Sequence, residues 1–193
     1  MSDSSDGLRP QLQFSKLDAA RRQMETAITL YFLEGDPVSI HSLTAASYAV
    51  LRDLNAHRGG APMFTKEGSL DHIKPESRKE YIRLVNEAEN FFKHADRDPN
   101  ETLTFDPGQS EVLLFDCCMK YRELTGEVLP LATLFQGWSR LTWARPFIDD
   151  SEFQRQAADI EKSLPHNFNR RQFFIKFLPI TYGSAAPFST GQP

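Results

Sequence analysis

Residues able to transfer a proton and bind phosphate gather in one short stretch, Glu89 to Asp98. Within it, Asn90 and His94 are four residues apart, so on a helix they are neighbours on one face. A histidine, whose reference pKa is about 6.5, can donate or accept a proton near neutral pH. An amide beside it can orient a phosphate or fix the imidazole tautomer. We therefore take Asn90 and His94 as the candidate catalytic pair.

Further polar side chains extend this face of the expected helix. Counted in helical steps, one stripe contains Arg83, Asn86, Asn90, His94 and Arg97. Cationic side chains such as Lys93 and Arg97 can bind phosphate oxygens through charge-assisted hydrogen bonds. The candidate binding residues are therefore Arg83, Asn86, Lys93 and Arg97.

A second interpretation of the same stripe involves no chemistry. Phe91 and Phe92 lie opposite the polar residues, which is the pattern of an amphipathic helix with one buried and one solvated face. The segment from His94 to Asp98 would then mark the end of that helix, where basic residues complement the helix dipole. This simpler interpretation is the favoured one, and it predicts that Phe91 and Phe92 are largely buried.

The spacing of Asn90 and His94 resembles that of HEPN domains. Ribonuclease members of that family carry an Arg, then a polar residue that is often Asn, then a His one turn further on. Asn90 and His94 match the polar and His positions, whereas Glu89 stands where the family has its Arg. The resemblance implies a helical bundle, often dimeric, with the polar helix face at the subunit interface and metal-independent RNA cleavage. The missing cation counts against that cleavage.

Metal ligation and bound cofactors are not predicted. The remaining histidines are scattered, without His-x3-His or Cys-x2-Cys spacing: His41, His57, His72 and His166. The carboxylates of Asp96, Asp98 and Asp106 lack the Gly and the closing Glu of a calcium loop. We expect each isolated histidine to be structural or exposed.

The two cysteines, Cys117 and Cys118, are adjacent in the sequence. Neighbouring residues rarely form a disulfide because the bond would strain the backbone. We expect at least one of them to pack in the core as a small apolar side chain. Free cysteines indicate a reducing compartment. With neither a signal-peptide pattern nor an apolar run of about 20 residues, the sequence predicts a cytoplasmic chain that does not contact a membrane.

Composition places the chain among ordinary globular proteins. Its 193 residues are 40% hydrophobic and 25% charged, and fifteen are Phe, which favours one domain with an aromatic core. The formal net charge of −4 provides no general attraction for nucleic acid. Binding to RNA would therefore depend on a local basic patch.

Helical periodicity and capping residues predict the elements that must position these side chains. Asp36-Pro37 is a strong helix start directly after a Gly35 stop, so the first two helices should form a tight hairpin. A short extended segment is expected at Glu101 to Phe105, and an amphipathic piece at 167–177. The predicted helices span 15–34, 36–57, 76–95, 109–124, 131–143 and 149–164.

We therefore expect an all-α fold: a single-domain bundle of about six helices over residues 15–178. Residues 1–14 should be a flexible tail and residues 179–193 a disordered end. Two functions are open: a non-catalytic interaction or dimerisation module resembling HEPN domains, or a HEPN-like ribonuclease with a degenerate site at Asn90 and His94. Glu89 and the negative net charge favour the module, whose partner would be a second copy or another protein. RNA is the substrate of the alternative.

Overall fold

The computed structural model describes residues 11–96, 99–143, 155, 158–159, 161–162 and 168–182. Its elements are helical, which confirms the all-α class: α1 (Lys16–Phe32), α2 (Pro37–His57), η1 (Glu67–His72), η2 (Pro75–Ser77), α3 (Arg78–Lys93), α4 (Gly108–Thr125), α5 (Pro130–Trp143) and α7 (Arg170–Tyr182). Most of the predicted helix at 149–164, Arg97, residues 1–10 of the predicted tail and residues 183–193 of the predicted end lie outside the described residues.

The hairpin of α1 and α2 forms as the capping residues predict. Ser15 and Asp18 make a reciprocal capping box at the start of α1. Asp36 accepts a hydrogen bond of 2.7 Å from the backbone N–H of Ser39, and Pro37 is the first residue of α2. The amide of Gly35 donates to the carbonyl of Leu30 at 2.8 Å and so closes α1.

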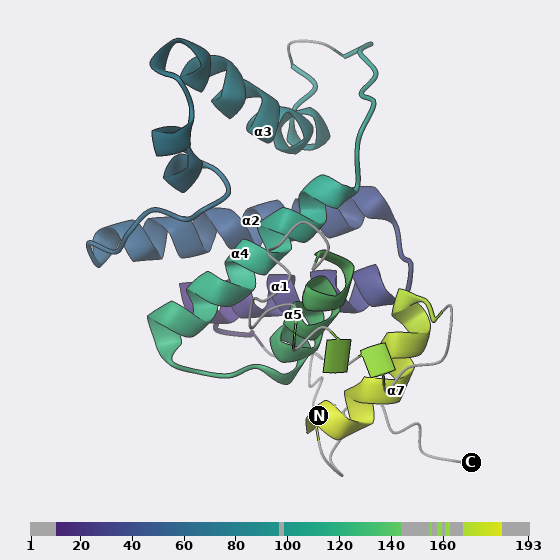
Figure 1. Cartoon of the computed structure of the whole chain (residues 1–193). Coiled ribbons are helices and arrows are strands. Elements are labelled where there is room, and N and C mark those ends of the chain that lie inside the picture. Colours follow the sequence, from purple (N-terminus) through teal and green to yellow (C-terminus); the bar gives the residue numbers. More distant parts are fainter. Residues whose placement is uncertain are drawn as a thin grey trace, which may run out of the picture.

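The core lies where the other helices cover this hairpin. Helix α4 packs on α2 and also touches α1, while α5 and α7 pack against each other and against α1 (Figure 1). Phe32 is at the centre, stacked on Phe174 with 5.0 Å between ring centroids and meeting Phe135 edge-on at 6.3 Å. Cys117 and Cys118 are both buried, as predicted, and burial raises the pKa of both thiols.

Helix α3 stands apart from this core. It lies above α2 and far from α7 in Figure 1, and it packs against α2 and η2. Ala88 is the only α3 residue that is fully buried, so the expectation for Phe91 and Phe92 was too strong, because both rings are half-buried. The amphipathic pattern is correct, but the loop and helix beneath α3 cover only part of its apolar face.

Two local expectations also differ from the structure. The segment Glu101 to Phe105, where a short extended segment was expected, forms no β-strand. An isolated extended segment has no neighbouring strand to pair with among the described residues, so its backbone groups cannot form a ladder. Helix α7 runs through Pro179 to Tyr182, so the amphipathic piece expected to end at 177 is longer, and the first four residues of the end expected to be disordered from 179 are helical.

Candidate functional site

The predicted polar stripe on α3 divides into residues that face outward and residues that face inward. Arg83 is exposed and its guanidinium pairs with Glu80 at 2.8 Å and Glu87 at 3.0 Å on the same helix. Asn90 is exposed, and so is His94, whose backbone N–H donates to the Asn90 carbonyl at 3.0 Å as α3 ends. Asn90 and His94 are thus linked through the backbone at the surface, where His94 is the C-cap of α3 and has an extended backbone.

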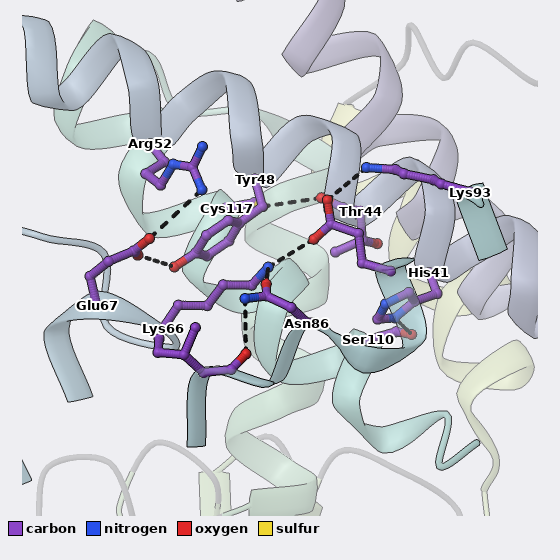
Figure 2. Close-up of polar contacts among 12 residues, drawn as sticks. His41, Thr44, Tyr48, Arg52, Lys66, Glu67, Asn86, Lys93, Ser110 and Cys117 are labelled. Atoms are coloured by element: carbon purple, nitrogen blue, oxygen red, sulfur yellow. Dashed lines mark hydrogen bonds and ion pairs between the residues drawn. The ribbon is translucent and has the colours of Figure 1, made fainter. Parts of the chain in front are cut away.

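Asn86 instead turns toward the body of the protein. Its side-chain Nδ2 donates to the Ile82 carbonyl at 2.9 Å, and its Oδ1 accepts a 2.6 Å hydrogen bond from Nζ of Lys66. Figure 2 shows the two side chains facing each other beneath α2. Asn86 therefore has a structural role that a purely solvated stripe does not predict.

Glu89, which stands where the HEPN ribonucleases carry Arg, is held by two cations. Its Oε2 lies 2.8 Å from Nζ of Lys66, and its Oε1 lies 2.6 Å from Nζ of Lys93. Burial alone would raise the pKa of this carboxyl, but hydrogen bonds from the two lysines lower the pKa below its ordinary value. Lys93, predicted to bind phosphate, is therefore engaged with a carboxylate of its own helix.

Lys66 is the residue that sequence reasoning missed. Its side chain is only 3% exposed, and its ammonium group lies 5.1 Å from the centroid of the Tyr48 ring as well as against Glu89 and Asn86. A buried ammonium group is stable only when it is paired and hydrogen-bonded, and these partners meet that need. No local pattern marks Lys66, because it lies in a loop and its partners are 20 and 23 residues away.

The loop that carries Lys66 is fixed from both sides. Both the backbone N–H and the hydroxyl of Thr65 donate to Asp116 on α4 at 2.8 Å, and Tyr81 on α3 donates to the Thr65 carbonyl at 2.7 Å. Next to it, the amide of Gly68 donates to the Met63 carbonyl at 2.8 Å. A Cβ at Gly68 would lie 2.7 Å from that carbonyl oxygen, so this close turn needs glycine.

A second polar group lies along α2, beside Lys66. The hydroxyl of Tyr48 donates to Glu67 at 3.3 Å, and Arg52 lies 3.7 Å from the other oxygen of that carboxylate (Figure 2). Burial and the neighbouring Glu67 raise the pKa of Tyr48, so its hydroxyl stays protonated near neutral pH. The group links α2 to the start of η1 and is a structural contact.

Of the two alternatives expected for an isolated histidine, structural or exposed, His41 takes the structural one. It lies on the inner face of α2, one turn before Ala45 and two turns before Tyr48, and is fully buried. Its Nδ1 lies 3.1 Å from Oγ of Ser110, and its Nε2 has no hydrogen-bond partner. A helical count from the buried positions of α2 is the signal that would have found it.

One further surface was not singled out by the sequence. We call it the α4 face: Val112 and Met119, which are 40% and 50% exposed, and the half-buried Phe115 between them. The ring of Trp143 packs 5.4 Å from that of Phe115, and the Gln136 amide lies 3.2 Å from the Met119 sulfur. Three successive apolar side chains thus lie on the side of α4 that faces away from α2.

Neither a metal centre nor a membrane span is found among the described residues. The part of the chain that the structure describes has no group of three or more His, Cys, Asp or Glu side chains placed to hold an ion. Among the same residues, none of the helices combines the length and apolar character that crossing a bilayer requires.

Comparison with known proteins gives no match. The chain fits no family model, and neither the curated proteins nor the solved structures contain a significantly similar chain. Function must therefore be inferred from the side chains and surfaces described above.

Proposed function

We propose that this chain is a non-catalytic interaction module that pairs with a second copy of itself through the α4 face. The α4 face is the observation that carries the proposal. Its three apolar residues follow one another at helical spacing, and two of them are at least 40% exposed in the single chain. Burying an apolar stripe of this kind removes its surface from water, which favours association.

Charges at the two ends of α4 support a second copy as the occupant. Asp106 and Glu111 lie at its N-terminal end, and the exposed Arg122 lies at its C-terminal end. A twofold axis near Phe115 would place two copies of α4 antiparallel, with Val112 of one copy over Met119 of the other. The Arg122 side chain would then lie beside the acidic end of the opposite helix, as a self-complementary interface requires.

The state of the α3 stripe supports a role without catalysis. Glu89 occupies the place of the family cation and is itself neutralised by Lys66 and Lys93. Arg83 is held by Glu80 and Glu87. Arg83 and Lys93, the two predicted phosphate-binding cations that the structure describes, are thus already paired with carboxylates, and the chain has a net charge of −4.

Sedimentation velocity over a range of protein concentrations tests the self-association. We expect the wild type to shift from monomer to dimer as the concentration rises, and Met119→Glu to stay monomeric because it puts a charge in the apolar stripe. The matched control is Ile175→Glu on α7, where an isoleucine is 61% exposed outside the α4 face. A wild type that is monomeric throughout, or a dimer that survives Met119→Glu, contradicts the proposal.

The second candidate is the HEPN-like ribonuclease, supported by the exposure of both Asn90 and His94 at the end of α3. Incubation of RNA with the wild type, His94→Ala and Asn90→Ala, in the presence of a chelator, tests it. Cleavage that is lost in His94→Ala and weakened in Asn90→Ala would establish the enzyme. The interaction module predicts no cleavage by any of the three proteins.

A further inference from the structure

His41 has an unusual environment for an ionisable side chain. It is fully buried on α2, and three other segments pack around it. The Phe92 ring of α3 meets the imidazole edge-on at 5.6 Å between centroids, and the Phe105 ring does so at 5.0 Å. Among the residues that the structure describes, Ser110 at the start of α4 supplies the only polar contact, and Nε2 has no hydrogen-bond partner.

These surroundings of His41 stabilise the neutral imidazole rather than the charged imidazolium. Protonation would turn both ring nitrogens into donors of a cation, yet one of them faces no acceptor. A buried charge without a partner costs several kcal/mol. The start of α4 adds to the cost, because the N-terminal end of a helix carries a partial positive charge.

The charged groups that face His41 do not remove this cost. From α3 they are Glu89 and Lys93, and from the preceding loop Lys66. Glu89 already binds both lysines, so the three together carry a net positive charge. On α4 and at Phe105, the contacts with His41 are uncharged.

We propose that His41 is an acid-sensitive latch: protonation of its imidazole releases α3 from α2 while the hairpin of α1 and α2 and the packed α4 stay folded. Release lets water reach the imidazolium. It also exposes the apolar side of α3, including Phe92, so the latch presents a new surface as the pH falls. The inference is independent of the proposed self-association through α4.

Helix α3 is the element that the latch can move. Of its residues only Ala88 is fully buried, so little core packing is lost when it separates. Its remaining ties include the contact of Phe92 with His41, the ion pair of Glu89 with Lys66, and the hydrogen bond of Tyr81 with the loop. By contrast, α1, α2 and α4 contribute most of the fully buried side chains.

The pH window follows from the titration of His41. In the closed state, in which α3 packs on α2, burial lowers the pKa of His41 from 6.5 to about 4. Lys66 and Lys93 also lower this pKa, whereas Glu89 raises it. When α3 is released, the group regains its ordinary value and binds protons more readily. The closed state is therefore fully favoured above about pH 6.5 and loses its advantage as the pH falls towards 4. Between pH 7.5 and pH 5, these two values shift the closing equilibrium by about 30-fold.

Hydrogen exchange of the full chain, expressed as protection factors so that the intrinsic pH dependence is removed, tests the latch. We expect the amides of α3 to lose about 30-fold in protection between pH 7.5 and pH 5, while those of α1 and α2 keep theirs. His41→Phe and His41→Gln should abolish the change in α3, because neither side chain can be protonated. His94→Gln, an exposed histidine at the end of the same helix, is the control and should leave the change intact.

Three results would overturn the latch. The first is unchanged protection of α3 across this pH range in the wild type, and the second is the same loss in both His41 variants. The third is a simultaneous loss in α1, α2 and α3, which would mean general acid unfolding. If either variant fails to fold, the wild type still decides: an imidazole of His41 that titrates at or above pH 6.5 by NMR, with α3 still protected, contradicts the proposal.

Discussion

The ion pairs on the two sides of α3 differ in how far they are buried. Arg83 and Glu87 pair at the surface, where both side chains are about half exposed and water weakens the attraction. Glu89 is 16% exposed and pairs with Lys66, which is 3% exposed, so few water molecules can replace either partner. Removing one member of the buried pair therefore lowers the free energy of unfolding more than removing one member of the surface pair.

This contrast predicts the outcome of Glu89→Arg, the change that would restore the cation of the HEPN ribonucleases. It would place a third cation beside Lys66 and Lys93, so we expect the free energy of unfolding to fall by about 3–5 kcal/mol. Urea denaturation monitored by circular dichroism measures the loss. Glu87→Arg is the control and should change stability by less than about 1 kcal/mol. Equal losses of stability from the two substitutions would mean that the buried pair stabilises the fold no more than the surface pair does.

The candidate pair could be predicted from the sequence because it depends on one helix only. Helical spacing predicts that Asn90 and His94 are neighbours, and both are exposed at the end of α3, where the backbone N–H of the C-cap His94 donates to the Asn90 carbonyl. Lys66 could not be predicted in the same way. Its partners lie on another element, and their approach depends on how the loop packs between α3 and α4.

At the scale of the element, capping residues and periodicity set the helix boundaries to within a few residues. The start of α2 at Pro37 follows from Asp36 and Pro37, and the end of α4 follows from Gly126, which has a φ of 72°. How deeply a helix is buried does not follow from its own pattern. The sequence of α3 is clearly amphipathic, yet its apolar face is half-covered, because among the described residues it is α2, η2, the preceding loop and the Phe105 segment that lie against it.

Phe91 and Phe92, at the end of α3, should consequently contribute differently to the free energy of unfolding. Phe92 meets the rings of His41 and Phe105, whereas the ring contact of Phe91 is with Phe92 itself. We expect Phe92→Ala to lower the free energy of unfolding by about 2 kcal/mol and Phe91→Ala by about 1 kcal/mol, both below the 3–5 kcal/mol of a fully buried ring. Denaturation at pH 7.5, where His41 is neutral, measures both. The reverse order would show that Phe91 anchors α3.

At the scale of the whole molecule, the buried and exposed apolar residues are unevenly distributed. The aromatic core joins α1, α5 and α7, as the ring contacts of Phe32 with Phe135 and Phe174 show. On α4, by contrast, Val112 and Met119 remain 40% and 50% exposed. A high Phe content predicted the core, because large rings favour burial. It could not predict the α4 face, because whether a stripe is covered depends on the arrangement of all the other elements.

If the α4 face joins two copies, the stability of the folded chain must depend on its concentration. Association of folded chains removes them from the unfolding equilibrium, so the Tm rises with total protein. We expect this rise in the wild type and in Ile175→Glu, and a constant Tm in Met119→Glu. Calorimetry at two concentrations about 30-fold apart, at pH 7.5 so that His41 stays neutral, measures the difference; such a ratio shifts a concentration-linked equilibrium by about 2 kcal/mol.

The comparison also separates self-association from a general effect of the substitution. Met119→Glu should match the wild type at low concentration, where both proteins are monomeric, because Met119 is half exposed and its replacement removes little internal packing. The two proteins should diverge only as the concentration rises. A Met119→Glu protein that is less stable by the same amount at both concentrations would show that Met119 supports the fold of the single chain, and the α4 face would then have no role in pairing.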